Sequence, residues 1–227
     1  MIKLSATLTA VLGLFVASAA MAAPITPVYG TFGPLAGATF SGTGIPNNPV
    51  AITTVGGLTL GLAASQRFVG PNLGHDGAGT YTAPAGVSQT APSPADPYAM
   101  WNFNIYIGGA TAGTSFRIFY DFDPTVGNDE STHGTIDIPG AALTSNPSQA
   151  SWNLGMNFLA AAAAGITPPA GVFDPNASGQ YTFALVAYNI GGPEIGRSAI
   201  AVKVPEPGTI ALVGLALLGA AATRRRA

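Results

Sequence analysis

The residues whose types and spacing best suit chemistry are the carboxylates gathered between positions 121 and 130. Hard oxygen ligands on a glycine-containing loop are what Ca²⁺ prefers, so this segment predicts a calcium site. The spacing departs from an EF-hand loop, because Asp121 and Asp123 fit the first and third positions but no glutamate stands at the twelfth. The candidate ligands are Asp121, Asp123, Asp129 and Glu130.

The same segment supports two other interpretations. Asp, Asn and Gly are the usual residues of hairpin loops, where their side chains bond the local backbone. His133 follows the carboxylates closely, and an imidazole beside them would suit a transition metal. The sequence leaves open a plain turn, a calcium site and a transition-metal site.

A catalytic group is harder to find. His75 and Asp76 lie in a glycine-rich turn, where the imidazole would act as a general base only beside a nucleophile. The chain has neither the Gly-x-Ser-x-Gly turn of serine hydrolases nor the His-Glu-x-x-His helix of zinc proteases. A glycosidase needs two carboxylates opposed across a groove, and most acidic residues here fall in or next to one loop. We therefore expect no catalytic residue and no enzyme activity.

Aromatic side chains offer another chemistry, since a ring beside polar groups is a common way to hold a sugar. Tyr106 is the best candidate, because it lies on the opposite strand face to Trp101 and shares that face with Asn102 and Asn104. The tryptophans lie on the apolar faces of alternating segments and are expected in the core. The full set is Tyr29, Tyr81, Tyr98, Trp101, Tyr106 and Trp152.

Composition excludes several classes of protein. Eight Lys and Arg stand against ten Asp and Glu, a formal charge of -2, so there is no basic surface for phosphates and we expect no nucleic-acid partner. The chain has no cysteine, which excludes disulfides, thiol nucleophiles and Cys-ligated metal centres. Its 30 Gly and 19 Pro, together with 9% aromatic residues, indicate a folded chain rich in turns.

The first 22 residues have the composition of a secretory signal peptide. Lys3 precedes a mostly apolar helical run, and the small residues Ala20 and Ala22 mark a cut before Ala23. We expect export through the Sec machinery and removal of residues 1–22 by signal peptidase. The mature chain would then begin near Ala23, outside the cytoplasm.

The C-terminus combines a Pro-Glu-Pro motif, a short apolar span and a cluster of arginines. Pro205 and Pro207 lack a backbone donor, so a helix can start at Pro207 but the segment before it should be extended and unpaired. The span 208–222 would form a single transmembrane helix of about 22 Å, which crosses a bilayer if flanking residues enter or the bilayer thins. The arginines that hold the C-terminus on the cytoplasmic side are Arg224, Arg225 and Arg226.

This order of features, with Val204, Pro205, Glu206 and Pro207 intact, resembles the PEP-CTERM sorting domain of exported proteins in Gram-negative bacteria that make extracellular polysaccharide. Residues 204–227 would then be the sorting signal. The resemblance implies recognition by an exosortase, a membrane-embedded enzyme similar to cysteine proteases, and processing at or near the Pro-Glu-Pro. It also implies an inner-membrane intermediate and delivery to the cell surface or matrix. The alternative is a C-terminal anchor that no enzyme cuts.

Between the two ends, residues 23–203 are enough for one domain with its own core. Alternation of apolar and polar residues with period two is the main pattern, typical of antiparallel strands with one buried face. We predict an all-β domain, an antiparallel two-sheet sandwich of the jelly-roll or Ig-like kind with about eight to ten strands. The expected strands are 50–62, 65–69, 101–107, 116–120, 134–138, 152–158, 181–185 and 198–204.

Two stretches do not fit this pattern. The alanine run 160–164 favours a short helix. Residues 80–96 have few apolar anchors and predict a long surface loop. Segments such as 44–46 and 121–124 resemble, more loosely, ectodomains that accompany the same tail, which implies a β-rich fold without a known activity.

These observations favour a non-enzymatic exported protein with a structural or adhesive role in the surface matrix. The first alternative is a polysaccharide-binding module assisted by calcium at residues 121–130, and the second is a secreted hydrolase. The expected partners are signal peptidase and the Sec machinery, the inner membrane before processing, an exosortase and an exopolysaccharide. No cofactor other than calcium is expected.

Overall fold

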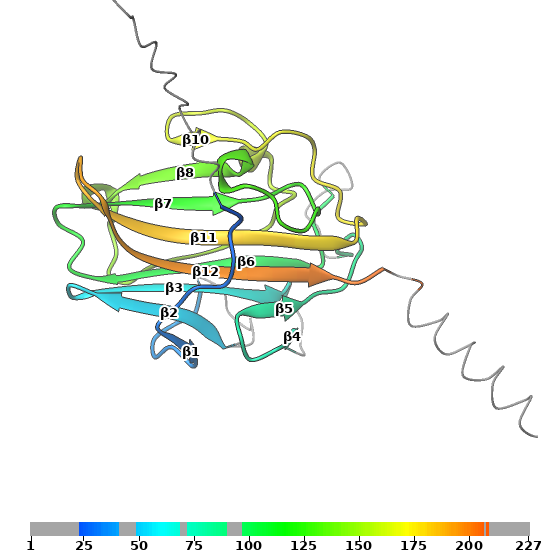
Figure 1. Ribbon diagram of the computed structural model, residues 1–227, viewed down its shortest axis with the longest axis horizontal. Helices are drawn as coiled ribbons and strands as arrows, with labels where there is room; N and C mark the ends of the chain where they lie inside the picture. Colours follow the sequence, from blue (N-terminus) through cyan, green and yellow to red (C-terminus); the bar gives the residue numbers. More distant parts are fainter. Residues whose placement is uncertain (1–22, 41–48, 69–71, 90–96, 207, 209–227) are drawn as a thin grey trace, which may run out of the picture.

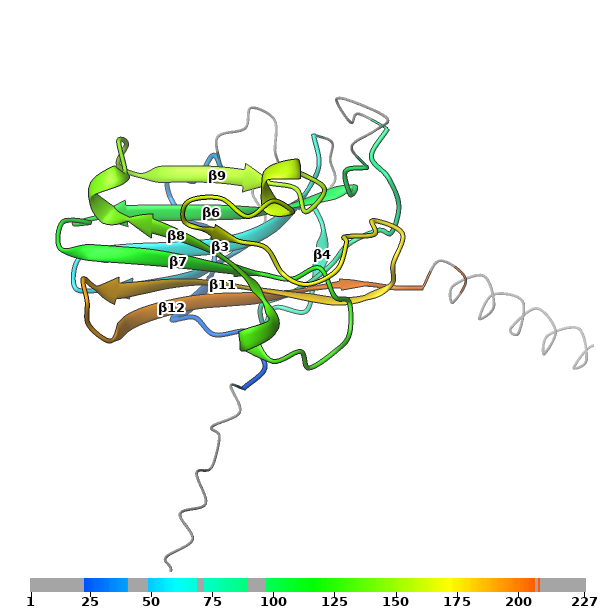
Figure 2. The ribbon, with the colours of Figure 1, turned by 90° about the horizontal axis from the view of Figure 1, so that it is seen from above.

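The computed structural model describes residues 23–40, 49–68, 72–89, 97–206 and 208, as β-strands, short 3₁₀ turns and loops. The strands form two sheets packed face to face, seen from above in Figure 2. The prediction of an all-β, two-sheet domain is confirmed. The expected signal helix, the membrane helix and the segment 44–46 lie outside the described residues. Within the described part of the chain, no helix is long and apolar enough to cross a bilayer.

The smaller sheet has five antiparallel strands in the order β1-β2-β3-β6-β9. Their bounds are β1 Thr31–Gly33, β2 Val50–Val55, β3 Leu58–Gln66, β6 Trp101–Gly109 and β9 Ser148–Trp152.

The larger sheet has seven strands in the order β10-β8-β7-β11-β12-β5-β4. Because β5 pairs with β12 in parallel, this sheet is mixed and not purely antiparallel as predicted. Its strands are β4 Gly74–His75, β5 Thr80–Thr82, β7 Thr114–Tyr120, β8 Gly134–Pro139, β10 Ile166–Thr167, β11 Gly179–Asn189 and β12 Glu194–Val204. The 3₁₀ turns are η1 Glu130–Thr132, η2 Gly140–Ala142 and η3 Asn157–Leu159.

The core fills the space between the inner faces of the two sheets. Phe183 of β11 lies against two rings of β6, stacking on Phe103 at 4.7 Å between centroids and meeting Trp101 edge-on at 6.0 Å. All three side chains are buried. Strand alternation puts them on the inner faces, and large buried rings contribute much of the apolar area that holds two layers together.

Two expected strands have different bounds. The segment 50–62 is two strands, β2 and β3, joined by Gly56 and Gly57, whose φ values of 55° and 80° suit a two-residue hairpin turn. Residues 65–68 do not form a separate strand, because β3 continues to Gln66 and then ends, and Val69 lies outside the described residues.

The expected strand 152–158 is wrong, because β9 ends at Trp152. The cause is Asn153, whose buried side chain donates to the carbonyl oxygens of Ala99 and Trp101 at 2.9 and 2.8 Å. These bonds turn the chain back toward β6, and a 3₁₀ turn follows where the alternation predicts more strand.

The two stretches outside the alternating pattern also differ from expectation. The alanine run 160–164 contains no α-helix and follows η3 as an irregular loop. Residues 80–89 are anchored in the sheet, because β5 pairs with β12 and Tyr81 is fully buried. Residues 90–96 lie outside the described part.

Residues 23–30 form a strap across the outer face of the seven-stranded sheet, the face turned away from the core (dark blue in Figure 1). Val28 exchanges two backbone hydrogen bonds with Ala199 of β12, with N–O distances of 3.1 and 2.7 Å. Ile25 is 4% exposed and packs into an apolar cluster on this face, made by Phe119, Ala184, Val186 and Ala199. The strap leads into β1, so it ties the larger sheet to the smaller one.

We predict that Ile25→Ala lowers the free energy of unfolding by about 2 kcal/mol or more, because a buried side chain is lost and a cavity is left. Val28→Ala is the matched control in the same strap; its side chain is 46% exposed. That change should cost about 0.5 kcal/mol or less. Urea unfolding followed by tryptophan fluorescence measures both. Equal losses would contradict the packing of Ile25 on the sheet.

Candidate functional site

The last strand of the larger sheet leads directly into the Pro-Glu-Pro motif. β12 is paired on both sides almost to its end, with Val204 opposite Gly179 of β11 and β5 beside it as far as Lys203. Val204 is buried. Pro205 and Glu206 are exposed and belong to no strand or helix. The hydrogen-bonded ladder therefore stops at the first residue of the motif.

A small hollow accompanies this exit from the fold. Its volume is about 250 Å³, and it is lined by the end of β12, the start of β11, Val126, Pro205 and Glu206. Pro207 and the three arginines Arg224, Arg225 and Arg226 lie outside the described residues. The structure thus describes three of the four motif residues: Val204, which is anchored in the sheet, and Pro205 and Glu206, which are exposed outside any strand.

The predicted signal-peptide junction lies at the start of the strap. Ala20 and Ala22 are outside the described residues, whereas Ala23 is described, exposed and accepts a 3.3 Å hydrogen bond on its carbonyl from the N–H of Glu130. A cut before Ala23 would keep the whole strap, including the buried Ile25.

The acidic segment is a turn whose side chains hydrogen-bond its own backbone. Asp121 is buried, and its carboxylate accepts hydrogen bonds from the N–H of Asp123 at 2.8 Å and from the Asn128 amide at 3.0 Å. Asp123 in turn accepts from the N–H of Thr125 at 2.9 Å. These side chains hold the backbone of the loop, as Asp and Asn do in Asx turns.

The other two predicted ligands point to different partners. Asp129 is the N-cap of η1 and accepts from the N–H of Ser131 at 2.9 Å. Glu130 forms an ion pair with Arg197 of β12. Among the residues that the structure describes, no three His, Asp or Glu side chains converge as metal ligands would. Calcium binding at this loop therefore stays a prediction, for which the described residues provide no cluster of three ligands.

His133 lies in a buried polar cluster under the same loop. Its Nδ1 is 3.1 Å from the carbonyl oxygen of Asp129, which can only accept, so Nδ1 carries the proton. In the neutral ring Nε2 then accepts from the Thr182 hydroxyl at 2.7 Å, and it lies 3.6 Å from the Asp121 carboxylate. Both ring nitrogens are occupied within the protein, so His133 is not placed as a free metal ligand.

The second histidine also belongs to a turn. His75 is exposed, and its Nδ1 accepts from the N–H of Gly77 at 3.1 Å. The Asp76 carboxylate accepts from the N–H groups of Ala78 and Thr80 at 2.7 and 3.0 Å. Both side chains therefore organise the glycine-rich turn.

Most of the aromatic candidates for sugar stacking are engaged in packing. Trp101 and Tyr81 are buried. Tyr106 is half-buried, but Asn102 and Asn104 on its face are buried and hydrogen-bonded to neighbouring strands, so this face is not the exposed one predicted. The remaining candidates are half-buried: Tyr29, Tyr98 and Trp152.

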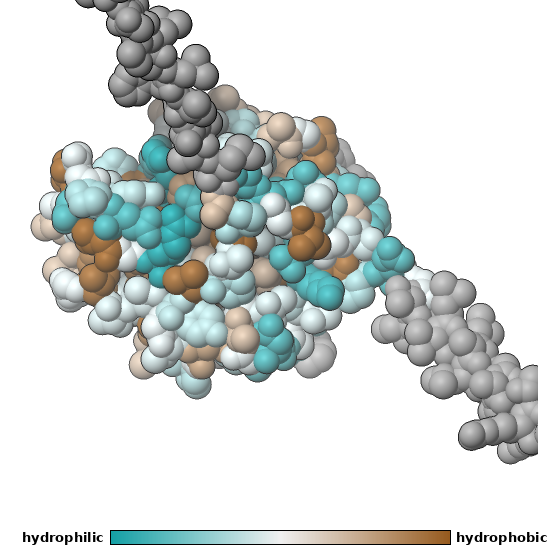
Figure 3. All heavy atoms as spheres, viewed as in Figure 1, coloured by the Kyte–Doolittle hydropathy of each residue, from teal (hydrophilic) through white to brown (hydrophobic). Residues whose placement is uncertain are grey.

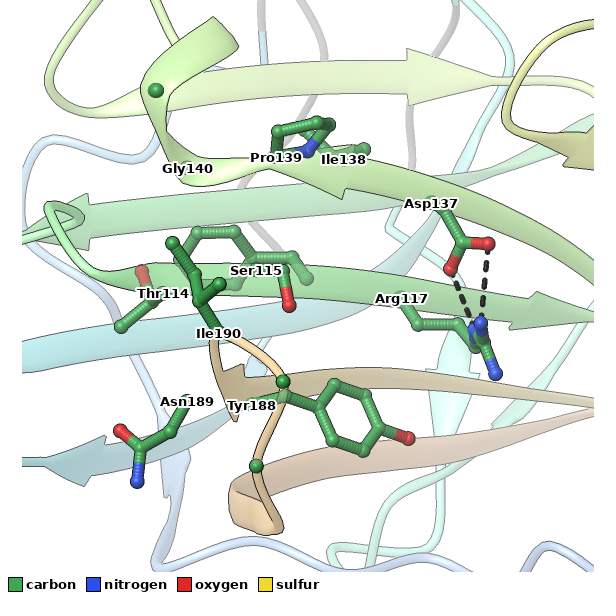
Figure 4. Close-up of a pocket in the computed structure, with 14 residues that line it drawn as sticks. Thr114, Ser115, Arg117, Asp137, Ile138, Pro139, Gly140, Tyr188, Asn189 and Ile190 are labelled. Atoms are coloured by element: carbon green, nitrogen blue, oxygen red, sulfur yellow. Dashed lines mark hydrogen bonds and ion pairs between the residues drawn. The ribbon is translucent and has the colours of Figure 1, made fainter.

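The structure reveals a groove that sequence reasoning missed, on the outer face of the seven-stranded sheet (Figure 4). Its volume is about 470 Å³. Arg117 of β7 and Asp137 of β8 form a bidentate ion pair at one end of it, with N–O distances of 2.6 and 3.1 Å. Tyr188 of β11 lies beside Arg117 on the same face, and Ser115 and Ile190 line the other end.

Backbone contacts fix the walls of this groove. The N–H of Ile190, at the tip of the β11–β12 hairpin, donates to the carbonyl of Gly113 at 3.2 Å. Gly140 of η2 lies so close to the Thr111 carbonyl that a Cβ would come within 2.3 Å of it. A β-bulge beside Tyr188 sets the direction of that side chain. The groove is therefore preformed.

Two carboxyl groups of the acidic loop titrate in opposite directions. Burial raises the pKa of Asp121 above its ordinary value, despite the hydrogen bonds it accepts. Hydrogen bonds from the hydroxyl and the N–H of Thr125 lower the pKa of the exposed Asp123. The contribution of Asp121 to stability is thus full below its unfolded pKa of about 3.9 and lost as the pH rises through its folded pKa. The contribution of Asp123 to stability is present above its unfolded pKa of about 3.9 and is lost as the pH falls through its folded pKa.

We therefore predict opposite pH trends for two amide variants. As the pH rises from about 4 to 7, Asp121→Asn should gain stability relative to the native protein. As the pH rises from about 3 to 5, Asp123→Asn should lose stability relative to the native protein. Urea unfolding of the three proteins across this range measures both trends. The same sign for the two variants would contradict the assigned shifts.

We predict that calcium leaves the melting temperature of the native protein unchanged, because the loop carboxylates already serve the turn. Thermal unfolding in calcium and in EDTA measures the difference. A higher melting temperature in calcium than in EDTA, if Asp129→Asn abolishes the difference, would instead establish the calcium site.

A comparison with family models matches residues 203–226 to the PEP-CTERM protein-sorting motif. No curated protein matches the chain. The match begins at the last paired residues of β12 and continues through the tail, and it does not extend over the rest of the β-sheets. The chain thus carries a PEP-CTERM protein-sorting motif, as its C-terminal sequence predicts, and this motif implies export and sorting by an exosortase.

Proposed function

We propose that this protein is a non-enzymatic component of the cell surface or its matrix, sorted there by an exosortase, with a structural or adhesive role for its β-sheet domain. The observation that carries the proposal is the junction between domain and tail. β12 stays paired up to Val204, and Pro205 and Glu206 emerge from it exposed. A processing enzyme needs a cleavage-site backbone that is not hydrogen-bonded within a sheet. The motif offers such a backbone directly after the end of β12.

Both expected cuts would leave the domain complete. A cut at or beyond Pro205 breaks no strand pairing, since the described ladder of β12 ends at Val204. A cut before Ala23 keeps the strap and its buried Ile25. Export and sorting would therefore deliver the same folded unit that the membrane-held precursor carries.

The polar groups of the domain support a non-catalytic role. The acidic loop caps itself, and the groove of Figure 4 has Asp137 as the single carboxylate among its described lining residues, held there by Arg117. Hydrolysis of a glycosidic bond would need a second carboxylate opposite the first. This groove therefore gives the secreted-hydrolase alternative no second carboxylate, and the acidic loop offers calcium no cluster of three carboxylate or imidazole ligands among the described residues.

The face crossed by the strap favours polar over apolar adhesion. On the face crossed by the strap, apolar residues form small patches separated by polar ones (Figure 3). A broad apolar patch would mark a membrane or protein interface, and this face does not offer one. Contacts made through this face would therefore rely on hydrogen bonds and small apolar patches.

We predict that the double variant Pro205→Ala/Glu206→Ala is neither shortened nor released when the full chain is expressed together with its exosortase. The native protein should lose its tail and leave the inner-membrane fraction. Pro193→Ala/Glu194→Ala is the matched control, because it removes another exposed Pro-Glu pair, from the β11–β12 hairpin, and it should be processed normally.

Immunoblots of membrane and extracellular fractions read the outcome. Processing of the tail variant, or retention of the native protein at full length with the exosortase present, would contradict the proposal.

A further inference from the structure

We propose that the groove of Figure 4 binds a neutral sugar unit of a polysaccharide, with Tyr188 as the stacking ring and the Arg117–Asp137 pair as the hydrogen-bonding edge. The inference rests on the adhesive role proposed above and gives that role a site. It places the site on the outer face of β7, β8 and β11, and none of the described lining residues belongs to the acidic loop or to the sorting tail.

Size and rigidity suit a sugar ring. A volume of about 470 Å³ falls within the usual range of small-ligand pockets. The Ile190 hairpin and Gly140 are held by backbone contacts, so the walls need not be ordered on binding. A preformed site avoids the entropy cost that weakens binding by flexible loops.

Tyr188 supplies the flat apolar surface. Its ring is half-buried, packed partly against the cluster under the strap, and the rest of it lines the groove. The C–H faces of a pyranose pack on such rings, as apolar groups do on aromatic faces. Because packing already restrains the side chain, binding immobilises little that was free.

The ion pair supplies the polar edge. The side chains of Arg117 and Asp137 are 42% and 49% exposed, so the pair is open to a ligand. Guanidinium has five N–H donors, of which Asp137 occupies two, and a carboxylate can accept further bonds. Vicinal sugar hydroxyls donate and accept at once, which matches a donor and an acceptor fixed side by side.

Charge favours a neutral ligand. The one positive and the one negative side chain among the described lining residues neutralise each other. An acidic sugar or a phosphate would need a cation with no carboxylate partner, and Arg117 already has one.

An extended peptide is a poorer occupant. Strand addition requires free backbone groups at a sheet edge. On the β8 side of the groove the N–H of Asp137 is already bonded to the carbonyl of Gly165 at 2.7 Å. Ligands must therefore be held by the side chains on the face of the sheet.

The test is affinity electrophoresis of the full-length protein in a mild detergent, in gels that contain laminarin, dextran, galactomannan or the acidic polymer alginate. We expect at least one neutral polymer to retard the native protein and alginate not to. Tyr188→Ala should weaken that binding about tenfold, the value of one aromatic contact, and Tyr188→Phe should keep it.

Two further variants make the result specific. Tyr106→Ala removes a half-buried tyrosine from the five-stranded sheet and should leave binding intact. Asp137→Asn keeps the shape of the groove but frees the charge of Arg117, so it should weaken binding to the neutral polymer and introduce binding to alginate. This second effect can be read even if Tyr188→Ala fails to fold.

Three results would overturn the inference: no retardation by any neutral polymer, full binding by a folded Tyr188→Ala, or loss of binding only in Tyr106→Ala. Tail processing is measured in the same variants. Normal processing without binding would refute the sugar site alone, whereas binding without processing would refute the sorting proposal alone.

Discussion

The pairing of β12 on both of its sides is the constraint on which the rest of the structure depends. At its start, the hairpin with β11 forms one wall of the groove. In its middle, Ala199 bonds the strap that carries Ile25 over the sheet. At its end, the ladder holds Val204 and stops where the sorting motif begins. One strand therefore positions the binding face, the N-terminal strap and the exit of the tail.

The polar residues of the domain have two different roles: some hydrogen-bond the local backbone, and others are exposed on the face of a sheet. Those of the acidic loop bond their own backbone, and the buried His133 and Thr182 complete that packing. A ligand at this loop would have to compete with the hydrogen bonds that hold the turn. The Arg117–Asp137 pair differs, since it lies on an open sheet face and keeps capacity to spare. Chemistry toward a ligand is thus expected where polar groups are exposed on a rigid sheet, and not where carboxylates are densest in the sequence.

Local physics made part of this predictable. Alternation located β6, β7 and β11 because residues two apart share a strand face. The sorting tail could also be predicted, because its motif is one continuous segment of the sequence. By contrast, β9 ends at Trp152 because Asn153 bonds Ala99, 54 residues away, and no local pattern reports that contact. The groove was hidden for the same reason: Arg117 and Asp137 meet only through the pairing of β7 with β8.

The mass of the exported, processed protein identifies its last residue and so tests most directly whether the paired β12 limits processing. Because the ladder of β12 holds Lys203 and Val204, we predict a C-terminus at Val204 or beyond, with β12 intact. A processed protein that ends before Val204 would contradict it, since the enzyme would then have cut a paired strand of the sheet.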